Sequence, residues 1–152
     1  MHPRPLTLLY ASLLIQLGAV IYSPLHQLPT AADTAAGEQL RGRLASIPGE
    51  VYMPSHGYLP SSVGKRPYAH TMAVADVCRA YHLPEARDLS AEIEVAIAQK
   101  HFAAIILDEP DDTVPVGIES YRSAGNMFGD SHVFFPVTGL PTRPQRIFFP
   151  HE

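Results

Sequence analysis

The chain has 152 residues, a formal net charge of −4, 15 prolines, one cysteine and no tryptophan, a size that fits one ordinary domain plus a further segment. The negative balance and the scattered lysines and arginines give no basis for binding nucleic acid. The single cysteine, Cys78, excludes an internal disulfide and any Cys-x-x-Cys metal or redox motif, and its apolar surroundings predict a buried, inert thiol.

The first predicted element is an apolar helix near the N-terminus. No charged residue occurs between Pro5 and Leu25, and tyrosines lie toward both ends of this stretch, as they do at membrane interfaces. A helix over residues 6–22 would be about 26 Å long, close to the ~30 Å hydrocarbon core of a bilayer. The pattern predicts a transmembrane helix over residues 5–23, with a cleaved signal peptide and a buried soluble helix as the alternatives.

The residues around this helix predict its orientation. Arg4 and His2 place the flanking positive charge on its N-terminal side, and positive charge is enriched in cytoplasmic segments. A cleaved signal peptide would send the rest of the chain to the same side. We therefore expect a protein of the cytoplasmic membrane, with the lipid bilayer as a partner, residues 24–34 as a linker, and residues 35–152 as a small extracytoplasmic domain.

The stretch "TAADTAAGEQLRGRLASI" predicts the next helix. Thr30 can cap its start, and Asp33 three residues later completes a pattern that resembles a capping box. Leu40, Leu44 and Ile47 form one apolar stripe at helical spacing. This helix is followed by a short predicted strand, "VYMPS".

A third helix is predicted over residues 70–81, where Val74, Val77, Cys78 and Tyr81 fall on one face and are expected to lie in the core. The clearest helical pattern comes next, in "LPEARDLSAEIEVAIAQKHF". Its apolar residues follow helical spacing, and either Asp88 or Ser90 can cap its start.

The last predicted elements are strands. Residues 102–107, "FAAIIL", form an uninterrupted apolar run that is typical of a strand buried on both faces in a parallel sheet. Two aromatic runs, residues 133–135 and 146–149, flank a turn-rich segment. Together these elements predict an α/β fold: one N-terminal transmembrane helix followed by a small extracytoplasmic α/β domain with a short, partly parallel sheet.

An acidic cluster follows the buried strand, at the strand end where α/β folds usually bind ligands. Its four carboxylates could bind a hard cation such as Ca²⁺ or Mg²⁺, although the EF-hand spacing is absent. A solvated acidic turn is the favoured interpretation, so we predict no metal site and keep these residues as weak candidates: Asp108, Glu109, Asp111 and Asp112.

The loop "PSHGYLPSSVGKRPYAH" gathers polar side chains that could contact a ligand, and a polar surface loop is the alternative interpretation. We select four ligand-contact candidates: His56, Tyr58, Lys65 and His70. The loop has no G-x-S-x-G elbow, and the chain has no phosphate-binding glycine loop or dinucleotide fingerprint. We therefore predict no catalytic residue and no cofactor.

Several segments together resemble the C-terminal end of bacterial polytopic membrane glycosyltransferases of the GT-C type. The resemblance is carried by a hydrophobic span that leads into soft sequence patterns, namely "YSPLHQLPTAADTAAGEQL", "IPGEVYMPSHGYLPSSVGKRPYAH", "MAVADVCR", "AIAQKHFAAIILDEP" and "FFPVTGLPTRPQRIFFP". It implies a link to sugar transfer from polyprenyl-phosphate donors on the outer side of the membrane. The catalytic acid of such enzymes lies in a loop between early spans, so the resemblance transfers no catalytic residue to this chain.

The resemblance implies that the chain is a last membrane span with an extracytoplasmic accessory domain. Its partners would be the remaining transmembrane core of a glycosyltransferase and a polyprenyl-phosphate sugar. One alternative is a stand-alone single-span membrane protein whose outer domain binds a ligand or partner. A secreted hydrolase that uses Ser61 or Ser62 with His56 or His70 is the least favoured alternative.

Overall fold

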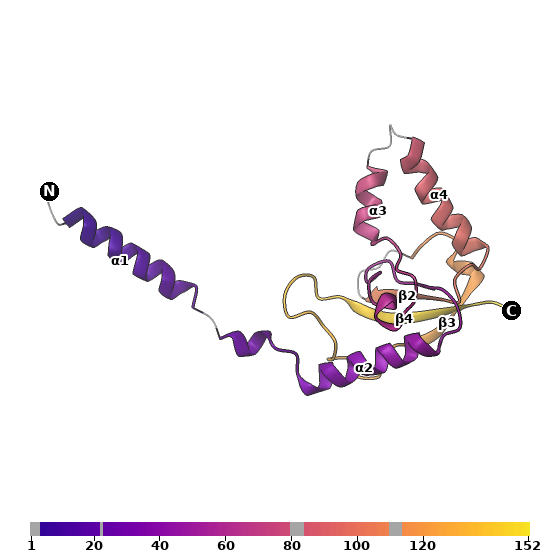
Figure 1. The fold of residues 1–152 in the computed structure, drawn as a ribbon, viewed down its shortest axis with the longest axis horizontal. Helices are drawn as coiled ribbons and strands as arrows, with labels where there is room; N and C mark the ends of the chain where they lie inside the picture. Colours follow the sequence, from indigo (N-terminus) through magenta and orange to yellow (C-terminus); the bar gives the residue numbers. More distant parts are fainter. Residues whose placement is uncertain (1–3, 22, 80–83, 110–113) are drawn as a thin grey trace.

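A four-stranded mixed sheet with helices on both faces forms the folded part of the chain (Figure 1). The structure is a computed structural model that describes residues 4–21, 23–79, 84–109 and 114–152. The sheet order is β1-β2-β4-β3, in which β1 runs parallel to β2 and the other neighbours are antiparallel. The strands are β1 (Val51–Tyr52), β2 (Ala104–Glu109), β3 (Tyr121–Asn126) and β4 (Arg143–Pro150). The predicted α/β class and the parallel strand pair are confirmed.

The described part of the chain holds four α-helices and three short 3₁₀ segments. The helices are α1 (Arg4–Ala19), α2 (Ala31–Ser46), α3 (Thr71–Cys78) and α4 (Pro84–Ala98). The 3₁₀ segments are η1 (Pro24–Gln27), η2 (Pro60–Val63) and η3 (Ile118–Ser120). In Figure 1, α2 lies along one side of the sheet, and α3 and α4 project from the other side.

Helix α2 covers one face of the sheet because its apolar stripe meets alternate residues of the strands. Leu40 and Leu44 are fully buried against Ala104 and Ile106 of β2. The predicted capping box is present: the Thr30 hydroxyl accepts a hydrogen bond from the Asp33 N–H, and the Thr30 N–H donates to the Asp33 carboxylate. The predicted start and core face of this helix are thus confirmed, and α2 begins inside the segment expected as a linker.

The opposite face of the sheet packs against α4. Ile97 of α4 is buried together with Ile105 and Leu107 of β2, which alternate with the residues that face α2. The Tyr121 hydroxyl donates to the Phe102 carbonyl at 3.0 Å and accepts from the Phe102 N–H at 3.2 Å. Burial raises the pKa of this hydroxyl above its ordinary value of 10.0. Strand β2 is therefore the centre of the core, buried on both faces as predicted.

Three predictions about local structure are wrong. No residue of α3 is buried, and Cys78 is only half-buried, because this helix packs mainly on α4 at the outside of the domain; Tyr81 lies outside the described residues. Helix α4 begins at Pro84, several residues before either predicted cap. Residues 133–135 form no strand, since Phe134 has a positive φ of 63°. Strand β3, with its mostly exposed sequence "YRSAGN", takes the edge position instead.

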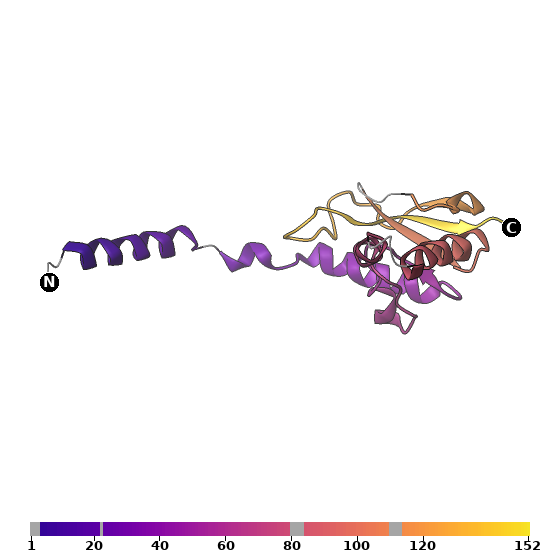
Figure 2. The same cartoon turned by 90° about the horizontal axis from the view of Figure 1, so that it is seen from above.

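The predicted transmembrane helix is not found: no helix in the described part of the chain is both long and apolar enough to cross a membrane. Helix α1 ends at Ala19, where the N–H groups of Val20 and Ile21 bond to carbonyls three residues back, as in a tight final turn. Every described side chain of α1 from Leu6 onward is exposed. Figures 1 and 2 show α1 standing away from the domain, joined to it through η1.

Candidate functional site

The carboxyl ends of the two parallel strands bring His56 and Asp108 together. Asp108 is the last residue but one of β2 and follows the alternation of Ala104 and Ile106, which face α2. His56 lies in the loop that follows β1. The His56 Nδ1 atom is 3.0 Å from Asp108 Oδ1. The Asp108 side chain is 2% exposed and the His56 side chain 21% exposed. The pair therefore joins a buried carboxyl group to an imidazole that reaches the surface.

This geometry defines the hydrogen-bonding roles of the imidazole ring. An ionised carboxylate can only accept hydrogen bonds, so Nδ1 is the donor in this contact. A neutral His56 then carries its proton on Nδ1 and presents Nε2 as an acceptor. A carboxylate in this position also fixes the ring orientation, as the outer partners of functional histidines do. Asp108 is thus a positioning residue for His56.

A pocket of about 380 Å³ lies beside the pair, between the start of α2 and the loop before β4. His56 contributes to its wall, together with Tyr58, whose ring centroid is 6.1 Å from that of His56. Most of the wall is apolar or aromatic, with a few polar groups, a composition typical of small-ligand sites. The other lining residues are Pro29, Asp33, Thr34, Gly37, Phe134, Phe135, Pro136, Val137 and Thr142.

Gly57 allows the loop that carries both side chains to pass close to a neighbouring segment. A Cβ atom at this position would collide with the backbone carbonyl oxygen of Tyr68. The loop also forms a turn in which the Leu59 N–H donates to the His56 carbonyl at 2.9 Å. Close backbone approach is a recognised reason for glycine, and here it positions the residues on either side.

The other two ligand-contact candidates lie elsewhere. The Lys65 ammonium donates to the carbonyls of Ile47 and Gly49, at 2.6 and 2.9 Å, just beyond the C-terminus of α2. His70 is the N-cap of α3, and its Nδ1 accepts from the Met72 N–H at 3.0 Å. The structure therefore brings His56 and Tyr58 to one pocket and gives Lys65 and His70 local contacts with the backbone.

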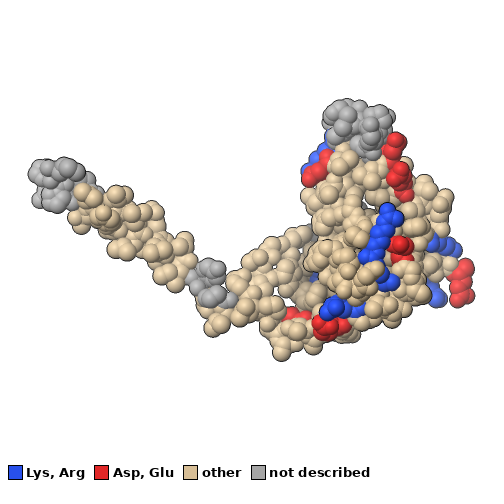
Figure 3. Space-filling model, viewed as in Figure 1, with Lys and Arg blue, Asp and Glu red and all other residues tan. Residues whose placement is uncertain are grey.

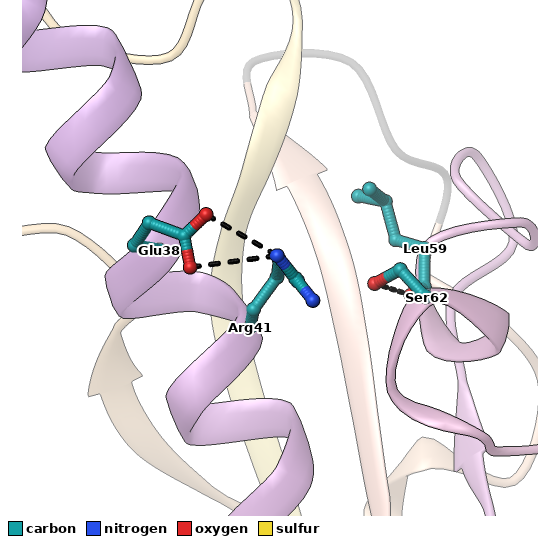
Figure 4. Close-up of polar contacts among 4 residues, drawn as sticks. All are labelled: Glu38, Arg41, Leu59 and Ser62. Carbon is teal, nitrogen blue, oxygen red and sulfur yellow. Dashed lines mark hydrogen bonds and ion pairs between the residues drawn. The ribbon is translucent and has the colours of Figure 1, made fainter.

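The two serines of the hydrolase alternative also make local contacts. The Ser61 hydroxyl donates to the Tyr58 carbonyl at 2.6 Å, and the Ser62 hydroxyl donates to the Leu59 carbonyl at 2.7 Å. Figure 4 shows the Ser62 contact in η2, across from the exposed Glu38–Arg41 ion pair on α2. Neither hydroxyl is arranged as a nucleophile beside a histidine, which is the contact that such chemistry needs.

The acidic cluster is divided between different environments. Asp108 binds His56, and the Glu109 carboxylate forms an ion pair with the Arg146 Nε atom at 3.3 Å. Asp111 and Asp112 lie outside the described residues. Within the described ranges, no three side chains of His, Cys, Asp or Glu gather in a way that could hold a metal ion.

A second pocket, of about 490 Å³, lies between α4 and the segment before α3. Tyr68 lines it, stands edge-on to Tyr52 and Phe102, and donates its hydroxyl proton to Glu50 at 3.0 Å. Burial, and next the Glu50 hydrogen bond, raise the pKa of Tyr68 above 10.0. Tyr52, Tyr68 and Phe102 were not selected as ligand-contact candidates, because the sequence does not show which aromatic rings come into contact in the fold.

The pairing of His56 with Asp108 was also missed, although each residue was selected for a different reason. The sequence did contain a signal for this pair: a histidine shortly after one predicted strand, and an aspartate at the end of a strand expected to run parallel to it. Comparisons with protein-family models, curated proteins and solved structures found no match to this chain.

Proposed function

We propose that this chain is a membrane-attached accessory domain of a glycosyltransferase-like membrane protein, without a catalytic centre of its own. Helix α1 attaches it, and the folded domain lies on the extracytoplasmic side, where it helps to shape the site for a polyprenyl-phosphate sugar or its acceptor. The observation that carries the proposal is helix α1, which is exposed from Leu6 onward and has no charged residue after Arg4. The glycosyltransferase context rests on the resemblance in sequence described above.

The surface of α1 favours an apolar environment. Between Arg4 and Asp33 the sequence has no aspartate, glutamate, lysine or arginine, and in the view of Figure 3 the tan part of this helix shows no blue or red atoms. Large side chains such as Leu8, Leu14 and Ile15 are 68–72% exposed. Burying one such side chain stabilises by about 1.5–3 kcal/mol, so several of them together favour insertion into lipid.

The proposal is attachment to the membrane and does not require that α1 cross it alone. Sixteen residues make a helix of about 24 Å, which is shorter than the ~30 Å hydrocarbon core. The helix can insert beside the apolar helices of a larger membrane protein, where all of its faces find apolar partners.

Vesicle flotation tests the attachment. The full chain should float with phosphatidylcholine vesicles, and the double variant Leu9→Asp/Leu13→Asp should remain in the dense fraction, because both charges fall on one face of α1. The matched control, Val114→Asp/Val116→Asp, adds the same charge at exposed apolar positions of the folded domain and should float normally. Equal flotation of both double variants, or no flotation of the native chain, contradicts the proposal.

A second candidate is a stand-alone membrane protein whose extracytoplasmic domain binds a ligand or partner. The His56–Asp108 pair beside a pocket favours it. An immunoblot of source cells with an antibody to residues 31–152 separates the two. A membrane-bound band several times heavier than 16.6 kDa supports the accessory domain, whereas a band near that mass supports the stand-alone protein.

A further inference from the structure

The loop between β3 and β4 presents apolar side chains at the end of the domain from which α1 departs. Figures 1 and 2 both show this loop reaching toward η1, and Pro29 lines the same pocket as Phe135 and Val137. The exposed fractions are 38% for Phe135, 49% for Val137 and 62% for Leu140. Leu25 lies within η1 and Leu28 directly follows it, and these side chains are 73% and 62% exposed. We call these five residues, Leu25, Leu28, Phe135, Val137 and Leu140, the apolar end surface.

The five residues of this surface carry no formal charge, and the Asp33 carboxylate, which lines the same pocket as Phe135 and Val137, accepts a hydrogen bond from the Phe134 N–H. Residues 131–142 contain no aspartate, glutamate, lysine or arginine. The two charged residues that flank this stretch are Asp130 and Arg143, and the Arg143 side chain is buried, with its guanidinium over the rings of Phe128 and Phe135. A patch without charge can approach the hydrocarbon boundary of a bilayer without the cost of desolvating ions.

Long-range contacts hold the loop in place. The Phe134 N–H donates to the Asp33 carboxylate of α2 at 2.7 Å. The Arg143 guanidinium donates to the Asp130 and Val133 carbonyls, at 2.9 and 2.5 Å. The apolar side chains at the tip are therefore presented by a segment that is tied to α2 and β4.

The connection to α1 is attached at one end of the domain and has a limited reach. Ten residues, 20–29, separate α1 from the capping residue of α2, and they span at most about 35 Å when fully extended. Wherever α1 inserts, the start of α2 lies within about 35 Å of that surface. The end of the domain that is joined to α1 is thus also the end with the apolar end surface.

We propose that the apolar end surface is a second membrane contact, in which Phe135, Val137 and Leu140 enter the boundary between lipid headgroups and acyl chains. This inference rests on the proposed attachment through α1 and adds an orientation for the domain. The partner is a lipid surface. Anionic lipid is not required, because the surface carries no cationic group.

The absence of tryptophan from the chain makes a direct test possible. Leu140→Trp places a single indole at the tip of the loop. Val116→Trp places one at a similarly exposed position, 65%, next to the glycine that packs on the end of α4. With phosphatidylcholine vesicles, the indole emission of the Leu140→Trp protein should shift to shorter wavelength and be quenched several-fold by brominated acyl chains. The emission of the Val116→Trp protein should change little.

The outcomes separate the two proposals. If the Leu140→Trp protein floats with vesicles but its indole is not quenched, the second contact is wrong and attachment through α1 stands. If the protein does not float, both proposals fail. A blue shift that depends on protein concentration and needs no vesicles would show that a second copy of the chain covers the surface, which also overturns the inference.

As a second measurement, Val137→Asp/Leu140→Asp should weaken vesicle partitioning about tenfold relative to Val114→Asp/Val116→Asp.

Discussion

His56 Nδ1 and Asp108 Oδ1 lie 3.0 Å apart although the two residues are 52 positions apart in the sequence. The contact joins the loop after β1 to the end of β2, and it orients the one histidine that lines the pocket beside α2. The carboxylate is almost fully buried, and the imidazole donates a hydrogen bond to it and covers part of it from solvent.

Asp108→Asn removes the charge but keeps the shape of the side chain. We expect the free energy of unfolding to fall by about 1–2 kcal/mol, because a hydrogen bond to a charged group becomes a neutral one. We also expect the His56 ring to lose its single tautomer, since an amide can either accept or donate. Urea denaturation and the ¹⁵N chemical shifts of the ring nitrogens measure the two effects. Glu119→Gln, at an exposed carboxyl, is the control; equal effects of the two variants would exclude a specific role for Asp108.

Gly57→Ala should destabilise the loop that carries His56 and Tyr58. The added methyl group meets the Tyr68 carbonyl, and overpacking of this kind costs about 1–3 kcal/mol. The matched control is Gly42→Ala in α2, where nothing lies within 4 Å of the new Cβ. It should stabilise the helix by up to about 1 kcal/mol. Thermal unfolding of both variants checks the opposite signs, and a neutral Gly57→Ala would show that this close approach is not required.

Asp33→Asn should reduce the loss of stability in acid. The Thr30 hydroxyl, and then the backbone N–H groups of Phe134 and Thr30, hold the pKa of the Asp33 carboxyl below its ordinary 3.8. The unfolded chain then takes up a proton at higher pH than the folded one. This contribution is therefore complete above the unfolded pKa and is lost as pH falls through the folded pKa.

Urea midpoints measured between about pH 6 and pH 2 test this linkage. The native protein should show a steeper decline with acid than Asp33→Asn. Asp88→Asn, at an exposed aspartate of α4, should keep the native slope. Parallel curves for the native protein and Asp33→Asn would contradict the prediction.

Arg143→Lys should destabilise the loop that forms the apolar end surface. The Arg143 Nη1 atom donates to both carbonyls while the planar guanidinium lies over two rings; a lysine keeps the charge but has no planar group to lie over those rings. The expected loss is about 1–3 kcal/mol, and protection of amide hydrogens in residues 130–142 from exchange should fall. Arg122→Lys, at an exposed position of β3, is the control. Unchanged stability and exchange in Arg143→Lys would mean that charge alone holds the loop.

Local patterns were most informative where one element contains its own signal. The capping box at Thr30 and Asp33, the apolar stripe of α2 and the continuous apolar run of β2 each describe a single segment, and the structure confirms all three. The interpretation was wrong for α3, whose apolar stripe packs on α4 but stays outside the core. It also missed β3, which has few apolar residues because an edge strand can leave much of its surface to solvent.

The α/β class, the central strand and the residue types that could bind a ligand were predictable from the sequence, because they follow from periodicity and from the chemistry of single side chains. The folded structure was needed to show that His56 contacts Asp108 and that Tyr58 lines the same pocket as His56. It was also needed to show that Lys65 and His70 bond to the backbone instead. Those contacts depend on how the strands align and how the loops close. Strand alignment and loop closure are properties of the packed chain as a whole, so no single segment encodes them.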